Sequence, residues 1–174
     1  MHSSPNRRTL LAGLATIAAG AAVTPHPAGA RGGVIAFEGR DVVVHSDEAW
    51  RSRLTPEQYD VLRKAGTEAP SSSPLLNEHR AGTFSCAGCN LALFDASTKF
   101  ESGTGWPSFF RPLPNAVATT TDTSLLETRT EVHCRRCSGH LGHVFDDGPK
   151  PTGLRYCMNG VAMVFSSHGT QRRG

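Results

Sequence analysis

The sequence predicts an α+β domain, mostly β, with small helices near its N-terminus and a mostly antiparallel sheet after them. Helix signals are confined to the part before residue 67, and short segments typical of strands, separated by Gly, Pro and Asn, begin at Gly82. Helices early and strands late are typical of α+β domains rather than of alternating βαβ units. The length of 174 residues is that of one domain with a substantial core.

Two segments carry helix start signals. Ser46 precedes two acidic residues and predicts a capped first turn. Thr55 is followed by Pro56 at the first helical position and by Gln58 three residues on, which is the pattern of a capping box. Because Gly66 is a typical stop, we expect a packing helix between Thr55 and Gly66.

The strands are predicted from short apolar or β-branched runs bounded by turn residues. Residues 67–74 are rich in Ser and Pro and are predicted to be a loop, and residues 34–37 are too short a run to assign. The strand candidates are Gly82–Ser85, Thr128–His133, Leu141–Phe145, Leu154–Met158 and Val161–Phe165.

The first thirty residues have the layout of an export signal. Arg7 and Arg8 precede an uncharged run rich in Ala and Leu, and residues 28–30 offer a small-x-small cleavage site. The paired arginines indicate the twin-arginine variant, and the apolar run is shorter than the roughly 20 residues of a membrane-spanning helix. We therefore expect a removed signal (1–30), a periplasmic or extracellular protein without stable membrane association, and one domain over 31–174 with its core at about 46–166.

The charge balance excludes a strongly basic nucleic-acid-binding surface. The chain has 18 Lys and Arg and 15 Asp and Glu. Residues 1–30 contain two Arg and no acid, so their removal would leave 16 basic and 15 acidic residues, a net charge of +1. The remaining chain has no marked excess of positive charge, and we predict no nucleic-acid partner.

Four of the five cysteines form two doublets with two residues between the sulfurs. Cys86 and Cys89 are followed by Asn90, and Cys134 and Cys137 are followed by Ser138-Gly139, so each doublet ends in a tight-turn residue. Two such knuckles can present four thiolates tetrahedrally to one structural Zn²⁺. Iron in the same site, two disulfides, or one redox dithiol are the alternatives, and the last expects a βαβ unit that the sequence lacks.

The fifth cysteine, Cys157, lies near other groups that carry chemistry. His140 and His143 are separated by three positions, and the glycines beside them favour a loop or an edge strand. Alternation along a strand would place Arg155, Cys157 and Asn159 on one face. Because a neighbouring cation favours a thiolate and an unpaired thiol near His is typical of a nucleophile, Cys157 is the candidate catalytic residue.

A third informative stretch is rich in glycine and aromatic residues. Gly103 and Gly105 precede Trp106-Pro107, which favours a bend that turns the indole towards a pocket. Phe109 and Phe110 follow, and core packing and pocket lining are equally compatible with their positions.

Taken together, these motifs resemble those of the B-type peptide-methionine sulfoxide reductases, which act on the R epimer. The matching segments occur in the family's order between about Trp50 and Phe165. The resemblance implies two antiparallel sheets with small flanking helices and one structural zinc ion, remote from the chemistry, held by four cysteines. The matching segments are Thr67-Glu68, Cys86–Cys89, 102–109, Cys134–Cys137, Gly139–Phe145, 147–149 and Gly153–Asn159.

The resemblance also implies roles for individual residues. Cys157 resembles the nucleophile, and His143 resembles the acid that protonates the sulfoxide oxygen, with His140 beside it. A supporting network is implied at Asp147, Arg155 and Asn159. Trp106 resembles the wall that receives the methyl group on sulfur, and Phe145 and Phe110 are the further substrate-binding candidates.

The sequence departs from the family pattern where many members carry a second, resolving cysteine. Thr104 stands at that position, and Gly160 and Ser71 replace residues common at the rim of the pocket. With the four paired cysteines assigned to metal, no thiol remains to form an internal disulfide with Cys157. We therefore expect oxidised proteins or peptides as substrates and a thioredoxin-like protein or a small thiol as the reductant.

Two other functions are compatible with parts of the sequence. A non-catalytic zinc-knuckle interaction module would explain the four paired cysteines but would leave Cys157 and the two histidines without a role. A cysteine hydrolase could use Cys157, His143 and Asn159, but the sequence shows no oxyanion-hole signature. Both explain fewer of the motifs than the reductase does.

Overall fold

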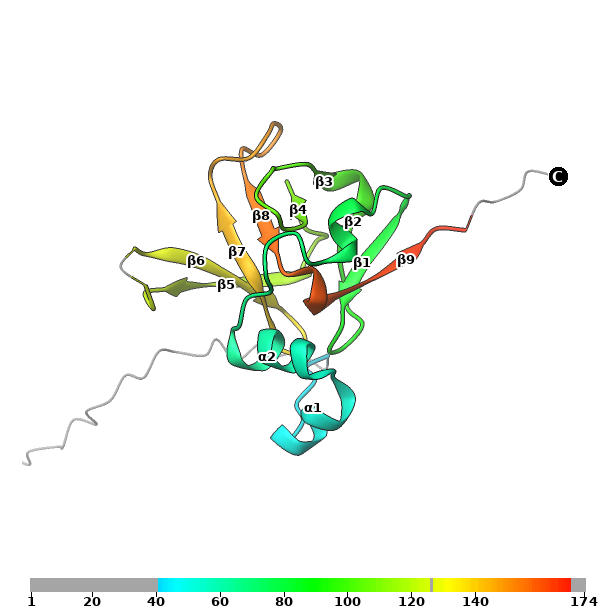
Figure 1. The fold of residues 1–174 in the computed structure, drawn as a ribbon, viewed down its shortest axis with the longest axis vertical. Coiled ribbons are helices and arrows are strands. Elements are labelled where there is room, and N and C mark those ends of the chain that lie inside the picture. The colour runs from blue at the N-terminus through cyan, green and yellow to red at the C-terminus, as the bar shows by residue number, and fades with distance from the viewer. Residues whose placement is uncertain (1–40, 126, 170–174) are drawn as a thin grey trace, which may run out of the picture. The chain divides into compact units, whose positions relative to one another are not determined.

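The computed structural model describes residues 41–125 and 127–169, which form an α+β fold with two antiparallel sheets (Figure 1). The sequence regions 1–30 and 34–37 lie outside the described residues. The strands are β1 (Gly82–Cys86), β2 (Ala92–Asp95), β3 (Lys99–Phe100), β4 (Ser108–Phe109), β5 (Val117–Asp122), β6 (Arg129–Cys134), β7 (His140–Phe145), β8 (Arg155–Met158) and β9 (Met163–Ser167). The smaller sheet has the order β2-β1-β9, and the larger has the order β3-β4-β8-β7-β6-β5. The predicted fold class is confirmed.

The two helices, α1 (Asp47–Arg53) and α2 (Pro56–Lys64), begin where their capping signals predict. The Ser46 hydroxyl accepts the Ala49 N–H, and both bonds of the capping box between Thr55 and Gln58 are present. The left-handed residue that ends α2 is Ala65, one position before the expected glycine. Three short 3-10 helices complete the elements of the described residues: η1 (Pro74–Asn77), η2 (Ala96–Thr98) and η3 (Gly160–Ala162).

The five predicted strands are present with small shifts at their ends, and four further strands were not predicted. β9 begins at Met163 rather than at Val161 because η3 precedes it. The strands β3 and β4 are two residues long, and β5 is dominated by threonine, so they lack the apolar alternation that identifies a strand.

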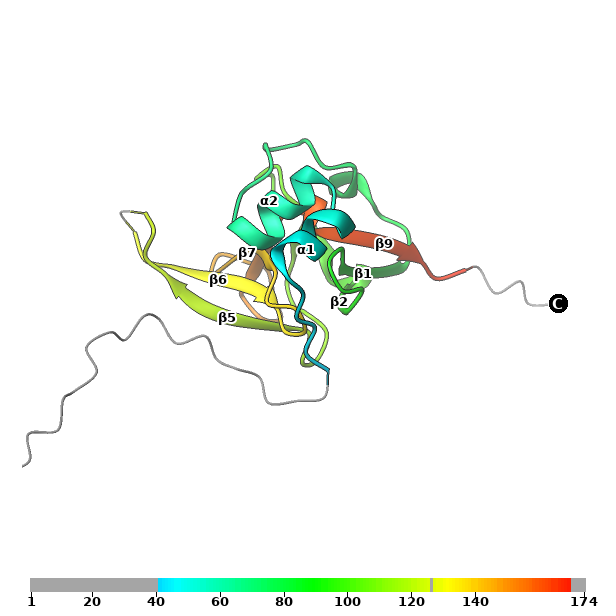
Figure 2. The ribbon, with the colours of Figure 1, turned by 90° about the horizontal axis from the view of Figure 1, so that it is seen from below.

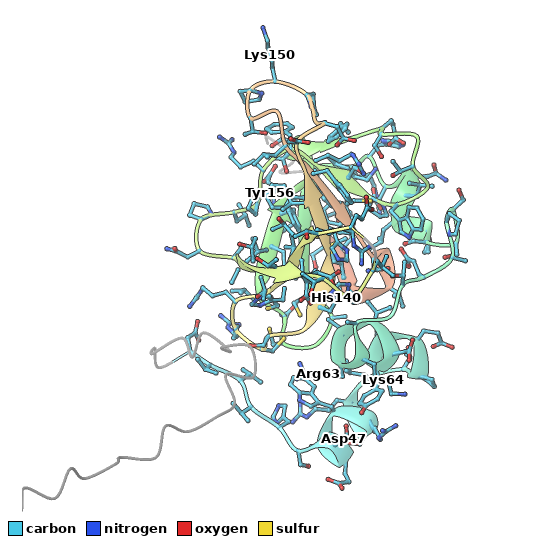
Figure 3. All side chains as sticks on the ribbon, turned by 90° about the vertical axis from the view of Figure 1, so that its left-hand side faces the viewer. Asp47, Arg63, Lys64, His140, Lys150 and Tyr156 are labelled. Carbon is cyan, nitrogen blue, oxygen red and sulfur yellow. The ribbon has the colours of Figure 1, made fainter. Side chains whose placement is uncertain are left out.

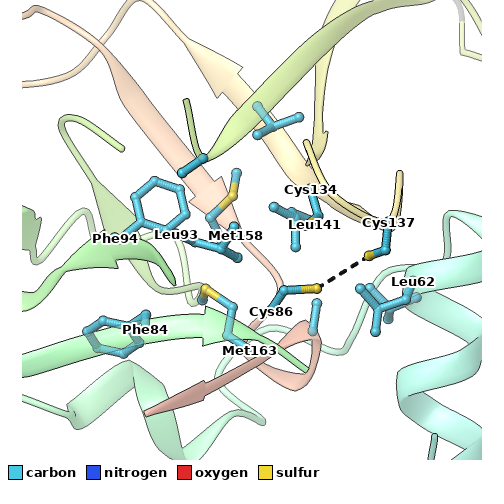
Figure 4. Packing of buried hydrophobic residues seen from close by; sticks show 14 of the residues in the cluster. Leu62, Phe84, Cys86, Leu93, Phe94, Cys134, Cys137, Leu141, Met158 and Met163 are labelled. Carbon is cyan, nitrogen blue, oxygen red and sulfur yellow. Dashed lines mark hydrogen bonds between the residues drawn. The ribbon is translucent and has the colours of Figure 1, made fainter. Parts of the chain in front are cut away.

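The core lies between the two sheets and is centred on three aromatic rings. Phe84 and Phe94 come from the smaller sheet and Phe109 from the larger, and all three are fully buried. The rings of Phe94 and Phe109 stack with centroids 4.3 Å apart, and Phe84 meets Phe109 edge-on at 5.0 Å. Figure 4 shows how Leu62 of α2 reaches this core beside the cysteines. Phe109 is therefore a core residue.

The helices cover one end of the sheets. α2 packs against β7 and η3, and Figure 2, seen from that end, shows both helices in front of the strands. The loop that carries Lys150 lies at the opposite end (Figure 3). Within residues 41–125 and 127–169, no helix is long and apolar enough to cross a bilayer.

Candidate active site and metal centre

Cys157 lies on β8, in the interior of the larger sheet. It pairs directly with His143 of β7 on one side and with Ser108 of β4 on the other. Directly opposite residues share a face of the sheet, so these three side chains are neighbours. Phe145 and Arg155, which also pair with each other, lie on the same face two residues away. The half-buried Cys157 thus has His143 directly beside it.

A β-bulge brings the two histidines of β7 to the same side. Residues three apart on a regular strand face opposite ways. The register between β6 and β7 shifts next to Val132, which pairs with Gly142, and Leu141 is the extra residue. As a result the rings of His140 and His143 lie 5.5 Å apart. The expectation of a loop or edge strand was wrong, because β7 is an interior strand.

Gly142 allows β7 to approach β8 at the nucleophile. Its φ of +155° is rarely adopted by residues with a side chain, and a Cβ placed there would lie 2.1 Å from the carbonyl oxygen of Cys157. Only glycine fits this position, so the glycine between the histidines sets how closely His143 approaches Cys157.

His143 is held by a carboxylate that the sequence did not single out. Its Nε2 lies 2.8 Å from Oδ2 of Asp122, which also accepts a hydrogen bond of 2.6 Å from Arg129. Hydrogen bonds from Ser124, and further ones from His143 and Arg129, hold the pKa of Asp122 well below its usual range. The ionised carboxylate only accepts, so the proton of the neutral imidazole lies on Nε2 and leaves Nδ1 free.

Burial acts on the same histidine in the opposite direction. Loss of solvent lowers the pKa of His143 below its usual value, while the hydrogen bond to Asp122 partly opposes that shift. The net direction is downward, so the neutral ring with an unprotonated Nδ1 is the main form near neutral pH.

His140 is built into the sheet rather than into the pocket. It is buried, and its Nδ1 lies 2.7 Å from Oε1 of Glu131. The hydrogen bond with His140 lowers the pKa of Glu131, so the carboxylate is ionised and Nδ1 carries the proton. The buried Nε2 of His140 has no hydrogen-bond partner among the described residues. This side chain can support the neighbouring His143, but it does not line the pocket.

A small pocket of about 140 Å³ opens beside Cys157. It contains Trp106, Phe145, His143 and Asn159, which the sequence assigned to the site, together with Thr67, Arg129 and Gly142. Phe110 is not among the lining residues; its ring lies under the guanidinium of Arg111 instead. A larger cavity of about 750 Å³ between α2 and η1 contains neither Cys157 nor His143.

Arg155 and Asp147 form a pair at the edge of this pocket. Two hydrogen bonds of 2.8 Å join the guanidinium to the carboxylate, and the guanidinium lies 4.4 Å from the centre of the Phe145 ring. The hydrogen bonds that the guanidinium donates to Asp147 raise the pKa of Arg155. Neither residue lines the pocket, so their contact with the site runs through Phe145 and Cys157.

Asn159 and Trp106 are joined through Glu68. The side-chain oxygen of Asn159 accepts the Glu68 N–H at 3.0 Å, and the Glu68 carbonyl accepts the indole N–H of Trp106 at 3.2 Å. The Glu68 carboxylate in turn accepts the backbone N–H groups of Gly160 and Val161 at 2.6 and 2.9 Å. One residue therefore fixes the wall of the pocket to the end of β8.

The other four cysteines converge on one point. Their sulfur atoms all lie within 4.8 Å of one another, with Cys89 and Cys134 at 3.5 Å and Cys86 and Cys137 at 3.7 Å. Figure 4 shows the contact between Cys86 and Cys137. Four sulfurs at about 2.3 Å from a tetrahedral ion would be separated by about 3.8 Å. The cluster is therefore positioned to bind one metal ion.

The two knuckles have the same backbone geometry. Asn90 and Ser138 both have left-handed φ values, 59° and 54°, and each donates its N–H to the carbonyl of the first cysteine of its doublet, at 2.8 and 2.9 Å. The turns predicted from the sequence are confirmed. Because Cys86 ends β1 and Cys134 ends β6, the cluster connects the two sheets.

Comparison with known proteins agrees with this geometry. The family model described as the SelR domain matches residues 54–167. The chain is 54% identical over 132 residues to the peptide methionine sulfoxide reductase MsrB of Leifsonia xyli. The aligned region covers 75% of this chain and 95% of the relative. It is 56% identical over 119 residues to the protein of that name from Pseudomonas putida strain W619, covering 68% and 90%.

The protein of that name from Methanosarcina barkeri is 50% identical over 133 residues, covering 76% of this chain and 94% of the relative. The chain belongs to the B-type methionine sulfoxide reductase family. The expected family is thus confirmed, and residues 54–167 include all five cysteines as well as His140 and His143.

In this B-type reductase the residues missed at the sequence level are mostly partners of residues that were found. Asp122 holds His143, Glu131 holds His140, and Glu68 holds Trp106. Glu131 lies within the predicted strand Thr128–His133 but was not singled out there, and Glu68 was visible only as a residue in a matching segment. Asp122 lies at the end of a threonine-rich strand and carried no signal of its own.

Proposed function

We propose that this protein reduces the R epimer of methionine sulfoxide in oxidised peptides and proteins, with Cys157 as the nucleophile. The observation that carries the proposal is the direct pairing of Cys157 with His143 at a pocket walled by Trp106. A sulfoxide sulfur is a poor electrophile until its oxygen is protonated, so the reaction needs a thiolate and an acid in one place.

The proton for this step comes from the Cys157 thiol by way of His143. Asp122 keeps the proton of the neutral ring on Nε2, so Nδ1 is free to take the proton of the thiol. The resulting imidazolium donates that proton to the sulfoxide oxygen while the thiolate attacks the sulfur. Asp122 acts here as the residue that orients the base and stabilises its charged form.

Reduction of the sulfoxide needs no reductant other than Cys157 itself. An external reductant is needed only to regenerate the Cys157 thiol afterwards. Cys157 thiol and sulfoxide give the methionine thioether and a sulfenic acid on Cys157, so the cysteine sulfur is oxidised as the substrate sulfur is reduced. One external thiol then forms a mixed disulfide with Cys157 and releases water. A second thiol displaces Cys157 and regenerates its thiol.

The external reductant follows from the positions of the other thiols. The four remaining cysteines of the chain all lie in the metal cluster, and Thr104 is the residue beside Cys157. We expect a thioredoxin-like protein or a small thiol to reduce the sulfenic acid directly. An intramolecular disulfide in the oxidised enzyme would contradict this.

The apolar wall selects the epimer. Trp106 and Phe145 line the pocket beside Cys157, and the indole is fixed by its hydrogen bond to Glu68. A methyl group on the sulfoxide sulfur fits against such aromatic faces, whereas the oxygen needs the polar side near His143. The two requirements are met together by one configuration at sulfur.

The metal proposed for the four cysteines is Zn²⁺. An all-thiolate tetrahedral set with separations near those observed suits zinc, which supplies a structural cross-link and no redox chemistry. Cys86, Cys89, Cys134 and Cys137 would hold it and so join β1 to β6. Iron remains the alternative that metal analysis distinguishes.

Residues 1–30 are proposed to direct export through the twin-arginine pathway, followed by cleavage. The support is the sequence alone: the arginine pair, the short apolar run and the small residues at 28–30. Replacement of Arg7 and Arg8 by lysine should retain the precursor in the cytosol, and unchanged export would refute this route.

The function is tested by turnover of a racemic methionine sulfoxide peptide with dithiothreitol. The wild type should consume only the R epimer, and Cys157→Ser should consume neither while binding metal normally. A Cys157→Ser protein that retains its function would favour the interaction module. Release of an alcohol or amine from an ester or amide, without methionine formation, would favour a hydrolase.

A further inference from the structure

A chain of hydroxyl groups ends on the sulfur of Cys157. The Oγ1 of Thr104 lies 3.8 Å from that sulfur and 2.8 Å from Oγ of Ser102. Ser102 Oγ lies 2.7 Å from Oγ of Ser108, which donates to the carbonyl oxygen of Trp106 at 3.1 Å. Ser108 is almost completely buried, so this end of the chain is fixed in the sheet.

Each hydroxyl has a single proton to donate, so counting these protons determines which hydroxyl donates and which accepts in each hydrogen bond of the series. Because Ser108 donates to the carbonyl of Trp106, it accepts from Ser102, and the Ser102 proton is thereby used. Thr104 then has two possible acceptors: Ser102 and the sulfur of Cys157. When Cys157 is a thiol, its S–H can donate to Thr104, which donates to Ser102.

The situation changes when Cys157 loses its proton. The thiolate only accepts, and a rotation of the Thr104 hydroxyl about its C–O bond is enough to turn its proton to the sulfur. The Ser102 hydroxyl still accepts a hydrogen bond from the backbone N–H of Thr104 at 3.4 Å. Each of the three hydroxyls therefore keeps a hydrogen-bond partner. A hydrogen bond to an ionised acceptor is stronger than one between neutral groups.

We propose that Thr104 is a further catalytic residue, whose hydroxyl accepts from the Cys157 thiol and donates to the thiolate. Ser102 is the positioning residue: its oxygen accepts the hydrogen bond of the Thr104 hydroxyl in the first state and no longer accepts it in the second. The inference rests on the proposed nucleophile, and it adds a second partner to Cys157 on the side opposite His143. His143 removes the proton, and Thr104 stabilises the charge that is left behind.

The test compares Thr104→Val, which replaces the hydroxyl by a methyl group of similar shape, with Thr104→Ser, which keeps the hydroxyl. Two experiments are done on the metal-loaded protein. The first measures kcat and KM with a methionine-R-sulfoxide peptide, and the second measures the rate at which iodoacetamide alkylates Cys157 at pH 7, followed by mass spectrometry of the peptide that contains Cys157. The alkylation rate reports the thiolate without requiring turnover.

For Thr104→Val we expect kcat and the alkylation rate to fall about tenfold, because a hydrogen bond to a charged group is lost. KM should stay near that of the wild type. For Thr104→Ser both rates should stay within about twofold of wild type. A thermal melt identifies any loss of fold, and Thr104→Ala then replaces Thr104→Val as the variant without a hydroxyl.

Wild-type alkylation in folded variants that lack the hydroxyl would overturn the inference. The proposed function fails differently: Cys157→Ser would keep reductase activity, whatever the Thr104 variants do. If Cys157→Ser is inactive and Thr104→Val is fully active, the role of Thr104 is refuted and the nucleophile stands.

Discussion

Oδ2 of Asp122 lies 2.8 Å from Nε2 of His143, although β6 separates the strands that carry the two residues. Asp122 is the last residue of β5 and pairs with Arg129, which binds the same carboxylate oxygen. The carboxylate thus reaches past the end of β6 to the ring on β7. This arrangement holds the proton of the neutral His143 ring on Nε2 and leaves Nδ1 unprotonated.

Asp122→Asn should lower kcat by about 10²-fold, within the range by which positioned acids and bases contribute. The amide can offer its NH₂ as well as its oxygen to Nε2, so the tautomer with a free Nδ1 is no longer fixed. KM should change little. Asp60→Asn, at an exposed position on α2, is the matched control and should behave as wild type.

The pH dependence of kcat/KM should have an acidic limb with its midpoint below pH 6.5. In the proposed reaction Cys157 and His143 share one proton, so a second proton on Nδ1 stops the transfer. Burial lowers the pKa of His143 from its ordinary value of 6.5, and nearby Arg129 and His140 act in the same direction. The limb therefore lies on the acidic side of that value.

Asp122→Asn should shift the acidic limb of the kcat/KM profile. The hydrogen bond that His143 donates to Asp122 raises the pKa of His143, so Asp122→Asn should move the midpoint to still lower pH. Circular dichroism at each pH excludes unfolding as the cause. A limb above pH 6.5, or one that moves upwards in the variant, would contradict the assigned role of His143.

Removal of the metal should destabilise the whole domain rather than only the active site. Cys134→Ser deletes a proposed ligand at the end of β6, so the cross-link that a metal ion would make between the sheets is lost. We expect zinc content to fall below one equivalent by elemental analysis, and the free energy of unfolding to fall by about 3 kcal/mol or more.

Cys157→Ser is the matched control for that experiment. It removes a thiol outside the cluster, so zinc content and thermal stability should equal those of the wild type while turnover is lost. Full stability of a zinc-free Cys134→Ser protein would show that the cluster does not support the fold.

The sequence predicted those parts of the molecule that depend on local patterns. The capping box at Thr55 and Gln58 and the two cysteine knuckles are local, because a few adjacent residues determine their geometry. The strand with Cys157 was visible from its alternation. Such patterns were sufficient to single out the candidate nucleophile and the cysteine cluster.

The remainder depends on contacts between segments far apart in the chain. The bulge at Leu141 exists only as a register between β6 and β7, and Asp122 is 21 residues from His143. Glu68 acts through its carbonyl and through backbone N–H groups of η3, which no side-chain pattern reveals. Phe110 was named as a substrate-binding candidate although its position also suited core packing, and it is not among the residues that line the pocket.

Glu68→Ala should loosen the wall of the pocket and lower the stability of the domain. The half-buried carboxylate accepts two backbone N–H groups, from Gly160 and Val161, and hydrogen bonds to charged groups contribute about 1.5–3 kcal/mol each. Their loss frees the segment whose carbonyl holds the indole of Trp106. We expect KM for the R epimer to rise several-fold and kcat to change less.

The fluorescence of Trp106 distinguishes a displaced wall from a general loss of stability, because Trp50 is buried in the core and should be unaffected. A red-shifted spectrum in Glu68→Ala, together with slow turnover of the S epimer, is the expected result. Glu68→Gln retains one acceptor oxygen and should be intermediate, whereas Glu48→Gln, exposed on α1, should match wild type. A destabilised Glu68→Ala protein with unchanged KM and unchanged epimer preference would limit Glu68 to a role in folding.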